Sequence, residues 1–433
     1  RGLGDVYKRQ PQNFQICSSS RTSWKQKSRR SWGRLGMKSE WTYRPLGELV
    51  SFASGGTPSK KRDDYWDGTI PWISAKTLKT ENIDTSDLFI TEEGLKAGSK
   101  IAPKGSILLL TRGSGLFNGI PIARVEKDVA FNQDIKCLDS YGEVENEFIF
   151  YWLLSQKDYL MAKVGVTGIG AGKFDLDFLQ KLMIPIPSER ERKSIVGFAS
   201  SISEKIRCNA KVNDNLEQQA ATYFQELFIN NANPVWQIST ISDLGTVVGG
   251  STPSKTKPEY YTNNGIAWIT PKDLSINKSK FISHGENDIT ELGLKNSSAT
   301  VMPKGTVLFS SRAPIGYIAI ASNEVTTNQG FKSVIPYSEI GTAFVYFFLK
   351  HSLPVIESAA SGSTFKEISG SAMKNIPAII PDRNTLDQFN SFCAPIFAQQ
   401  KILEEQNHSL AMLRDSLLPK LMSGAIDIAS IQL

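Results

Sequence analysis

The chain has 433 residues, which is enough for two or three domains, and 40% of them are hydrophobic, which is enough for real cores. No apolar run approaches the roughly 18–20 residues that a membrane-spanning helix needs, so we expect no membrane association. The four cysteines (Cys17, Cys137, Cys208 and Cys393) are scattered and provide no disulfide framework. This use of cysteine is typical of a reduced, cytoplasmic compartment.

The net charge of +6 comes from the first 36 residues, which hold nine Lys or Arg and one acid, Asp5. The remaining residues comprise 40 basic and 42 acidic side chains, a net charge of −2. Because residues 1–36 show no periodic apolar pattern, we expect a non-native or disordered tail, with the native start at Met37. A genuine basic arm that binds nucleic acid is the alternative. Any binding to DNA must therefore come from local patches, not from overall charge.

From Met37 onward the chain repeats itself at offsets between 195 and 200 residues. The repeated motifs are Thr-Pro-Ser-Lys (57–60 and 252–255), Trp-Ile (72–73 and 268–269), Pro-Lys-Gly (103–105 and 303–305), Asn-Gln (132–133 and 328–329) and an aromatic run (148–153 and 344–349). Shared composition cannot produce a nearly constant offset, so the chain holds two copies of one folded unit. The unit is far too long for a solenoid repeat of roughly 20–50 residues. A duplicated unit predicts a target with two similar halves.

Residues 37–187 and 236–381 form the two copies of a mixed, strand-rich module. Short β-rich runs alternate with Gly, Pro and Asn in both. The first module ends in Ile-Pro-Ile-Pro at 184–187, where the prolines stop any helix and favour an extended backbone. The second ends in the longer Ile-Pro-Ala-Ile-Ile-Pro at 376–381.

A long helix is predicted after each module, within residues 188–235 and 382–433. Ser188 and Asp382 are suitable N-caps. Apolar residues recur every seven positions, and the two sets are offset by 194 residues: Ile195, Ile202, Leu216 and Tyr223 in the first, and Phe389, Ile396, Leu403, Leu410 and Leu417 in the second. Such heptads predict a coiled coil of helices about 40 residues and roughly 60 Å long, with Asn209 and Asn213 interrupting the seam.

Together these patterns predict an α+β fold with two pseudo-symmetric strand-rich domains joined by two long helices that form an antiparallel coiled coil. In this arrangement the helix pair is a spacer that places the modules at its opposite ends. The alternative is that each helix packs on its own module and serves only as a linker.

Catalytic motifs are not recognisable in the sequence. The glycine-rich segment 168–173 lacks the first Gly of a P-loop and has Phe174 where Ser or Thr would bind magnesium. The three histidines lack metal-ligand spacing, and Asp134-x-Lys136 is only half of a nuclease pattern and is interpreted as a strand with an exposed lysine. We therefore expect a binding protein with no catalytic residues, no metal site and no bound cofactor.

The repeated polar residues are the candidate binding residues. Hydroxyl and ammonium groups in Gly/Pro loops suit phosphate oxygens, arginine can contact guanine, and amides can contact adenine. The candidates in the first module are Thr57, Ser59, Lys60, Lys61, Lys76, Arg112, Ser114, Asn132, Gln133, Thr167 and Lys173. Those in the second are Thr252, Ser254, Lys255, Lys272, Ser311, Arg312, Asn328, Gln329 and Thr364.

Each candidate also has a purely structural interpretation. The Asn-Gln pairs can cap turns, and Lys104 and Lys304 in the Pro-Lys-Gly motifs are expected in exposed β-turns. Trp72 and Trp268, which are flanked by isoleucines in the Ile-Pro-Trp-Ile and Ile-Ala-Trp-Ile motifs, are predicted to lie in the core.

Several motifs occur twice in the same order: Ser-Gly-Gly-Thr-Pro-Ser-Lys at 54–60 with its echo at 249–255, and Ile-Pro-Trp-Ile at 70–73 with Ile-Ala-Trp-Ile at 266–269. The stretch Leu-Arg-Asp-Ser-Leu-Leu-Pro-Lys-Leu-Met-Ser-Gly at 413–424 follows near the end. With these motifs the chain from Met37 onward resembles the specificity (S) subunit of type I restriction–modification systems. The central helix departs from the pattern, since it has Tyr-Phe-Gln-Glu-Leu-Phe at 223–228 instead of Leu-Leu-Pro-Lys-Leu-Met.

The resemblance implies two target recognition domains that each read one half of a bipartite site in double-stranded DNA. It also implies helices that dock two methyltransferase (modification) subunits, together with restriction (motor-nuclease) subunits; S-adenosylmethionine, ATP and Mg²⁺ would be used by these partners and not by this chain. The loops at 113–115 and 313–315 differ, which predicts an asymmetric site. The alternatives are a DNA-recognition fragment of another modification enzyme and a duplicated module that does not bind DNA.

Overall fold

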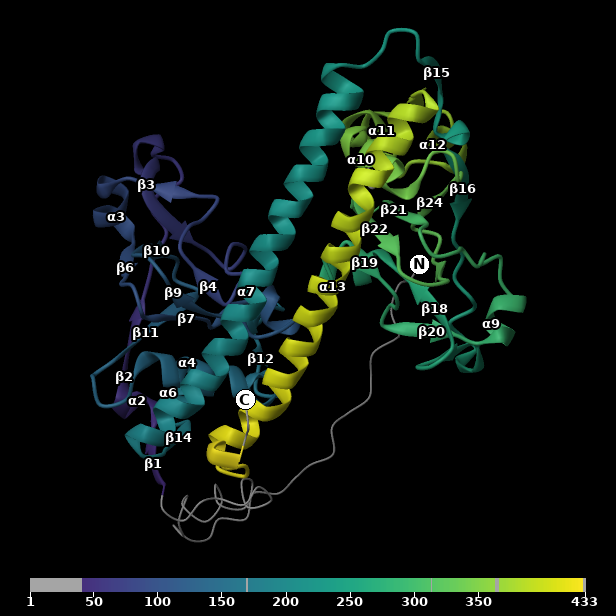
Figure 1. The fold of residues 1–433 in the computed structure, drawn as a ribbon. Coiled ribbons are helices and arrows are strands. Elements are labelled where there is room, and N and C mark those ends of the chain that lie inside the picture. The colour runs from purple at the N-terminus through teal and green to yellow at the C-terminus, as the bar shows by residue number, and fades with distance from the viewer. Residues whose placement is uncertain (1–40, 169, 313, 363–365, 431–433) are drawn as a thin grey trace, which may run out of the picture. The chain divides into compact units, whose positions relative to one another are not determined.

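The computed structural model describes residues 41–430 except 169, 313 and 363–365. The expected tail, residues 1–36, and the candidate Thr364 lie outside the described residues. The chain divides into two compact units (Figure 1): one takes the residues up to Ser200 and those from Arg414 onward, and the other takes residues 201–413. Each unit therefore holds one module and parts of both long helices.

The module of the first unit is built on two main sheets. The larger has the strand order β2-β11-β7-β9-β4 (Val50–Ser54, Ile135–Ser140, Ile107–Leu110, Ile122–Val125, Asn82–Ile83), and the smaller has the order β5-β3-β10-β6 (Phe89–Ile90, Trp66–Ile73, Val129–Phe131, Lys100–Ala102). A small sheet has the order β12-β13-β8 (Gly165–Val166, Gly172–Lys173, Arg112–Gly113), and β1 (Thr42–Pro45) pairs with β14 (Met183–Ile186) to bring the ends of the module together. All four residues of β7 are buried, so this strand lies in the core.

Five short helices complete the first module: α2 (Leu46–Leu49), α3 (Glu92–Gly98), α4 (Asn146–Ser155), α5 (Lys157–Met161) and α6 (Leu176–Gln180). The repeated aromatic run forms α4, in which every residue from Phe148 to Leu154 is buried. A helix that is apolar on all sides belongs in a core, and this explains why the run lacks an amphipathic pattern.

The second unit repeats this architecture. Its sheets have the orders β16-β24-β21-β22-β19 (Gly245–Gly249, Lys332–Pro336, Val307–Ser311, Ile315–Ala321, Phe281–Ile282) and β17-β20-β18-β23 (Tyr261–Thr262, Asn287–Ile289, Ile266–Ile269, Thr326–Thr327), and β15 (Gln237–Thr240) pairs with β25 (Pro377–Ile380). Its helices are α8 (Pro271–Ile276), α9 (Glu291–Lys295), α10 (Thr342–His351), α11 (Leu353–Ala359) and α12 (Gly370–Lys374).

The larger sheets of the two modules have matching strand order, and the smaller sheets share the pairing of the strand that carries the repeated tryptophan. In the first, β3 and β10 are parallel, with Trp72 opposite Ala130; in the second, β18 and β23 are parallel, with Trp268 opposite Thr326. Both tryptophans are in the core, with 4% and 6% of their surface exposed, as predicted. The offset of 196 residues is therefore a structural equivalence, and the prediction of two copies of one fold is confirmed.

The Pro-Lys-Gly motifs form matching turns. Gly105 and Gly305 have φ angles of +87° and +89°, and each turn is closed by a backbone hydrogen bond to the carbonyl of Pro103 or Pro303. A positive φ at the third turn residue requires glycine or a residue that tolerates the left-handed region. Lys104 is exposed in its turn, as predicted.

The two long helices are α7 (Glu189–Gln225), which continues into a short π-helical segment (Glu226–Asn230), and α13 (Arg383–Met422). Ser188 and Asp382 cap them as predicted, since Ser188 Oγ accepts the backbone N–H of Glu191 and Asp382 Oδ1 accepts that of Thr385. Every predicted seam residue is buried or half-buried: Ile195, Ile202, Leu216, Tyr223, Phe389, Ile396, Leu403, Leu410 and Leu417.

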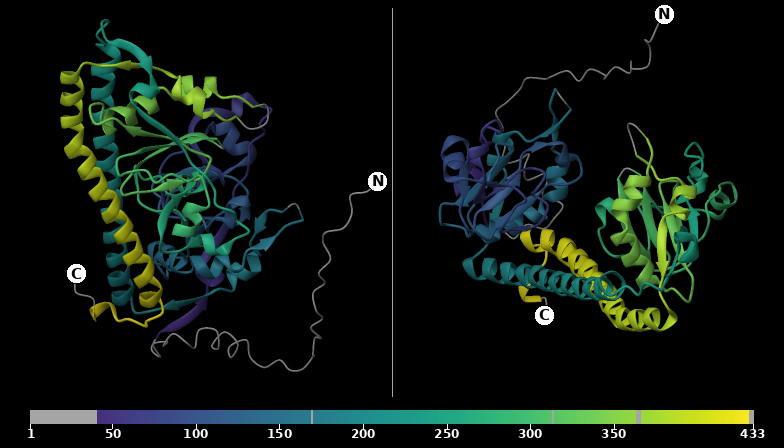
Figure 2. Two further views of the ribbon diagram at one scale, coloured as in Figure 1. Left: turned by 90° about the vertical axis from the view of Figure 1, so that its right-hand side faces the viewer. Right: turned by 90° about the horizontal axis from the view of Figure 1, so that it is seen from above.

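Within the second unit the helices run antiparallel, as the contacts between them show. Asn209 donates to Asn407 (2.9 Å), Gln400 donates to the carbonyl of Asn213 (3.2 Å), and the ring of Tyr223 lies 4.5 Å from that of Phe392. The numbering thus rises along one helix as it falls along the other, and Figures 1 and 2 show the two side by side. The interruption at Asn209 is a buried polar layer, in which its amide also donates to Gln406.

Gly197 lies at an exposed position within α7. A Cβ at Gly197 would meet no atom within 4 Å, and helical glycine costs about 0.5–1 kcal/mol relative to alanine. Gly197→Ala is therefore expected to raise the thermal midpoint by a few degrees, measured by circular dichroism. An unchanged or lower midpoint would show that this part of α7 does not form a helix of the stated bounds.

Candidate nucleic-acid interface

In the first module the Thr-Pro-Ser-Lys loop is bound directly to the Asn-Gln turn. Thr57 Oγ1 donates to Gln133 Oε1 (2.7 Å), although the two residues are 76 positions apart. Trp72 also binds the loop, since its indole N–H donates to the carbonyl of Gly56 (3.0 Å). The backbone N–H of Gly56 donates to the carbonyl of Phe131 (2.9 Å). We name this arrangement the loop–turn bridge.

The second module has the same loop–turn bridge at equivalent positions. Thr252 Oγ1 donates to Gln329 Oε1, and the indole N–H of Trp268 donates to the carbonyl of Ser251 (3.0 Å). The backbone N–H of Ser251 donates to the carbonyl of Thr327 (2.8 Å). The repeated tryptophan therefore has the same structural role in both modules, because its buried ring positions an exposed loop.

Glycine is required where the loop passes the turn. A Cβ at Gly55 would lie 2.0 Å from the carbonyl oxygen of Phe131, and a Cβ at Gly250 would lie 2.1 Å from that of Asn328. Both are collisions with backbone atoms, which cannot rotate out of the way. Gly55 and Gly250 therefore allow the close approach that makes the bridge possible.

The two asparagines stabilise the turn itself. The side-chain oxygen of Asn132 accepts the backbone N–H of Asp134 (3.1 Å), and that of Asn328 accepts the backbone N–H of Gly330 (2.9 Å). Asn132 is only 6% exposed. Both bonds are of the Asx-turn type, and this leaves the exposed Gln133 and Gln329 as the amides that face solvent.

A small sheet places Arg112 and Lys173 beside the bridge of the first module. Arg112 on β8 is paired with Lys173 on β13, and both are exposed. The backbone N–H of Arg112 donates to the carbonyl of Asp134, which follows the Asn-Gln turn (3.2 Å). Thr167 closes the hairpin between β12 and β13, since its hydroxyl accepts the backbone N–H of Ala171 (3.1 Å).

The second module differs at this place. Arg312 is bridged to Glu367, which occupies the position of Lys173, and the two side chains form an ion pair (3.3 Å). Lys332 lies 3.7 Å from the same carboxylate. By contrast, Arg112 has no ion-pair partner among the residues with defined positions in this structure. The position that is basic in the first module, Lys173, is therefore acidic in the second, Glu367.

The remaining candidates fall into three groups. Those exposed near the loops or strand ends are Ser59, Lys60, Lys61, Lys76, Ser114, Ser254, Lys255 and Lys272, and Lys272 is engaged in an ion pair with Glu286 (2.6 Å). Ser311 is completely buried, so its side chain does not reach the surface that the other residues share. Thr364 lies outside the described residues.

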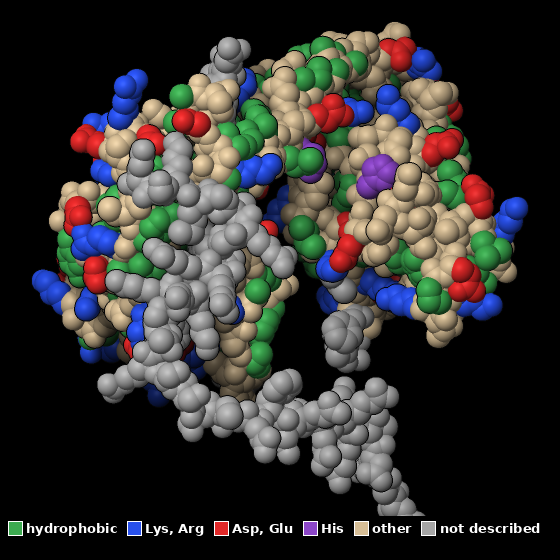
Figure 3. Space-filling model, turned by 90° about the horizontal axis from the view of Figure 1, so that it is seen from below, with side chains coloured by type: hydrophobic (Ala, Val, Ile, Leu, Met, Phe, Trp, Pro, Cys, Tyr) green, Lys and Arg blue, Asp and Glu red, His purple; other side chains and the backbone are tan. Residues whose placement is uncertain are grey.

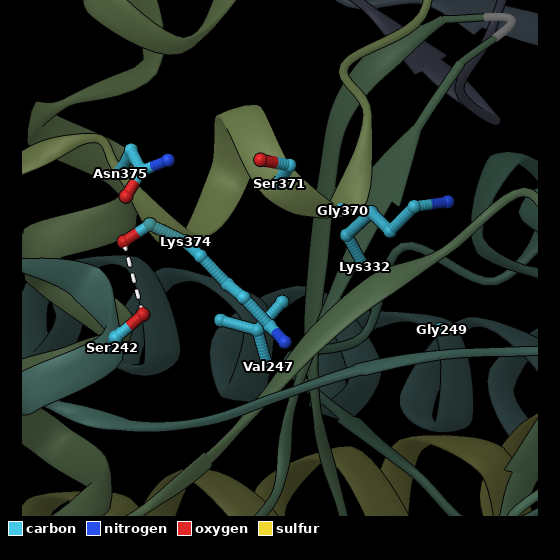
Figure 4. Close-up of a pocket in the computed structure, with 8 residues that line it drawn as sticks. All are labelled: Ser242, Val247, Gly249, Lys332, Gly370, Ser371, Lys374 and Asn375. Carbon is cyan, nitrogen blue, oxygen red and sulfur yellow. Dashed lines mark hydrogen bonds between the residues drawn. The ribbon is translucent and has the colours of Figure 1, made fainter.

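A cavity of about 550 Å³ opens beside the site of the second module (Figure 4). Lys332 on β24 and Lys374 and Ser371 on α12 line it, and Ser242 donates to the carbonyl of Lys374 (3.2 Å). Sequence reasoning missed Lys332, although a repeat signal was present, since Lys136 lies at the same offset of 196 residues. Lys136 lies on a strand as predicted, but it is half-buried and contacts Ser54.

Charge is distributed in small groups on the face drawn in Figure 3, where Lys and Arg side chains are interspersed with Asp and Glu side chains. Among the residues that the structure describes, no group of three or more His, Cys, Asp or Glu side chains is placed to hold a metal ion. Across residues 41–430, apart from the gaps, no helix combines the length and apolar composition needed to cross a membrane.

The two equivalent strand-rich modules and the antiparallel helix pair define the class: a protein with two copies of one candidate binding module. Comparison with known families identifies the family, because the model of the type I restriction modification DNA specificity domain matches residues 38–218 and again 234–407. The chain belongs to this family. Membership does not favour the alternative of a duplicated module unrelated to DNA.

Known relatives agree with this assignment. The chain is 43% identical to the specificity subunit of the type I restriction enzyme MjaIX of Methanocaldococcus jannaschii over 162 residues, and 28% identical to that of EcoR124I/EcoR124II of Escherichia coli over 200 residues. These alignments span 37% and 45% of this chain and 37% and 49% of the relatives. The chain thus matches half or less of their length.

A solved structure supports the fold over most of the chain. It is the S subunit of a type I restriction–modification system from M. genitalium, with a TM-score of 0.52 and 18% identity, covering 90% of this chain and 98% of the other. The prediction of two strand-rich domains and two long helices is confirmed.

Proposed function

We propose that this chain is the sequence-specific DNA-binding subunit of a type I restriction–modification complex. Each module, residues 37–187 and 236–381, reads one half of a bipartite site in double-stranded DNA. The helical regions, 188–235 and 382–433, set the spacing and dock partner subunits. The observation that carries the proposal is the loop–turn bridge, which is built twice at equivalent positions and has exposed lysines on its loop in both modules.

The chemistry of the site suits DNA. Lys60 and Lys61 on the loop of the first module and Lys255 on that of the second are exposed and can neutralise phosphates. Gln133 and Gln329 are exposed amides held by threonine hydroxyls, and a glutamine amide can donate to and accept from an adenine edge. The bridge orients these amides before DNA arrives, which lowers the entropic cost of binding.

The reactions themselves are assigned to partners. Two methyltransferase subunits would supply S-adenosylmethionine binding and DNA methylation, and restriction subunits would use ATP and Mg²⁺. This chain would contribute recognition and no catalytic group. The family and the relatives named as specificity subunits support this division of labour.

The proposal predicts an asymmetric bipartite site. The complex should be produced in a host that lacks its own adenine methylation, and the methylated positions should be read by methylation-sensitive sequencing. We expect two different half-sites at a fixed separation, and no methylation in a control host that has the partner subunits but not this chain. Recovery of a perfect palindrome would contradict the asymmetry, and absence of methylation dependent on this chain would contradict the function.

The position shared by Lys173 and Glu367 is expected to contribute to that asymmetry. A carboxylate accepts from the amino groups of cytosine or adenine, whereas Lys and a free Arg donate to guanine. Glu367→Lys should therefore change the base preferred at one position of the second half-site, by about 10- to 100-fold in relative affinity. The reciprocal control, Lys173→Glu, should change only the first half-site. Unchanged preferences in both variants would exclude this position from base recognition.

A further inference from the structure

One position has opposite charge in the two modules although its backbone setting is the same. Glu81 directly precedes β4, and its carbonyl accepts the backbone N–H of Arg124 (2.9 Å). Lys280 directly precedes β19, and its carbonyl accepts the backbone N–H of Ile320 (2.7 Å). Glu81 and Lys280 are therefore equivalent residues, one acidic and one basic.

In the first unit Glu81 is anchored to α13. Arg414 binds its carboxylate through two nitrogens, at 2.6 and 3.1 Å, and the Arg414 side chain is only 8% exposed. Lys157 adds a third contact at 3.2 Å. A bidentate, largely buried Arg–carboxylate pair has a well-defined geometry. Arg414 belongs to the helix that follows the second module, so this anchor joins the two sequence halves.

In the second unit Lys280 is anchored to α7. Its side chain is 5% exposed, forms an ion pair with Glu217, and donates to Gln400 (2.6 Å). The ammonium group also lies 4.1 Å from the centre of the Phe397 ring. Glu217 belongs to the helix that follows the first module. This anchor therefore joins the second module to the helix of the first half, whereas the Glu81 anchor joins the first module to the helix of the second half.

The two helix residues occupy corresponding faces. With the heptad offset of 194 residues, Arg414 corresponds to Ala220, which lies three residues from Glu217 and therefore on the same face of α7. The first half of the chain thus contributes acids at both anchors, Glu81 and Glu217. The second half contributes bases at both, Lys280 and Arg414.

We propose that these anchors are a charge code that makes the two halves of the chain pair with each other and not with second copies of themselves. If two first halves paired, Glu81 of one would face Glu217 of the other. If two second halves paired, Lys280 would face Arg414. A buried charge without its counterion is strongly unfavourable, so both wrong pairings are disfavoured where the modules meet the helices. The code selects the partner of each half and does not depend on whether DNA is bound.

Full-length variants test the code. The all-basic variant carries Glu81→Lys and Glu217→Lys, the all-acidic variant carries Lys280→Glu and Arg414→Glu, and the inverted variant carries all four. We expect each double variant to lose about 5–10 °C in thermal midpoint. The inverted variant should regain part of that loss, because Lys157 and Lys350 remain beside the two reversed acidic positions. A matched control, Glu204→Lys with Glu405→Lys, reverses two exposed helix charges and should change the midpoint by no more than 1–2 °C.

Pairing itself is measured by refolding mixtures of differently tagged chains. The all-basic and all-acidic variants, unfolded and refolded together, should co-purify as a swapped heterodimer, because each half then finds its opposite on the other chain. Wild-type chains refolded with each other should not. The proposal is overturned if the inverted variant is no more stable than the double variants, or if the mixed variants associate no more than either variant does with itself.

Discussion

Gly250→Ala is expected to weaken binding to the second DNA half-site about 10- to 100-fold while leaving the first half-site unaffected. A Cβ at this position would lie 2.1 Å from the carbonyl oxygen of Asn328 and 2.4 Å from that of Thr327. The loop must therefore move away from the turn, which separates Thr252 from Gln329 and removes a preoriented amide from the interface. Loss of one good base contact or one phosphate-positioning loop corresponds to about 1–3 kcal/mol.

The duplication supplies the matched control for this experiment. Gly55→Ala produces the same collision in the first module, 2.0 Å from the carbonyl of Phe131, and should weaken only the first half-site. Gly249→Ala, at the neighbouring glycine, meets no atom within 4 Å and should change affinity little. Binding of the assembled complex to duplexes with one half-site altered at a time can be measured by fluorescence anisotropy. Equal loss at both half-sites in either variant would show that the effect is general unfolding and not local displacement.

Lys280→Met is expected to destabilise the second unit by about 3 kcal/mol, or roughly 6–12 °C in thermal midpoint. The lysine is replaced by an apolar side chain of similar length, so packing is largely kept while Glu217 loses its buried partner. Glu217 retains Lys350 (2.6 Å), which is 41% exposed and therefore compensates only in part. The double variant Lys280→Met/Glu217→Gln removes both charges and should recover part of the loss; no recovery would show that packing and not charge is responsible.

The same ion pair predicts how stability depends on pH. Burial raises the pKa of Glu217, but the charges and hydrogen bonds of Lys280 and Lys350 outweigh it, and the pKa lies below its ordinary value of 4.5. A carboxyl whose pKa is lowered by folding stabilises the protein above its unfolded pKa, and this contribution is lost as the pH falls through the folded value. The pKa of Glu81 is lowered in the same way by Lys157 and Arg414, against its burial. The thermal midpoint should therefore decrease as the pH is lowered below about 4.5. This decrease should be less steep in Glu217→Gln than in the wild type.

The repeat and the heptads predicted the architecture because both are patterns of solvent exposure along a continuous segment. Apolar residues seven positions apart must share a helix face, so the heptad pattern places Phe389 and Leu403 in the seam whatever the partner helix is. A similar argument predicts Trp72 and Trp268 in the core, since an indole flanked by isoleucines on a strand is most stable away from water. These inferences need only local geometry.

The binding site was predicted less completely. The pattern identified Thr57 and Gln133 as candidates but did not predict that they touch, because a contact across 76 positions depends on how β3 and β10 return to the same sheet. It also included Ser311, whose hydroxyl the fold buries at the end of a core strand. Glu367 was missed because its motif does not repeat: the equivalent residue is Lys173, and only strand pairing reveals the equivalence.

The duplicated strand-rich modules and the two heptad helices follow from the amino-acid sequence alone, because periodicity and repetition record which side of each element faces the core. The contacts between distant residues are known only from the folded chain: Thr57 with Gln133, Glu81 with Arg414 and Glu217 with Lys280. These contacts depend on strand register and on helix direction, and a shift of a single residue would redirect the side chains involved. The sequence contains these charged residues but does not show which of them pair. The fold brings Glu81 and Arg414, which are 333 positions apart, within 3 Å of each other.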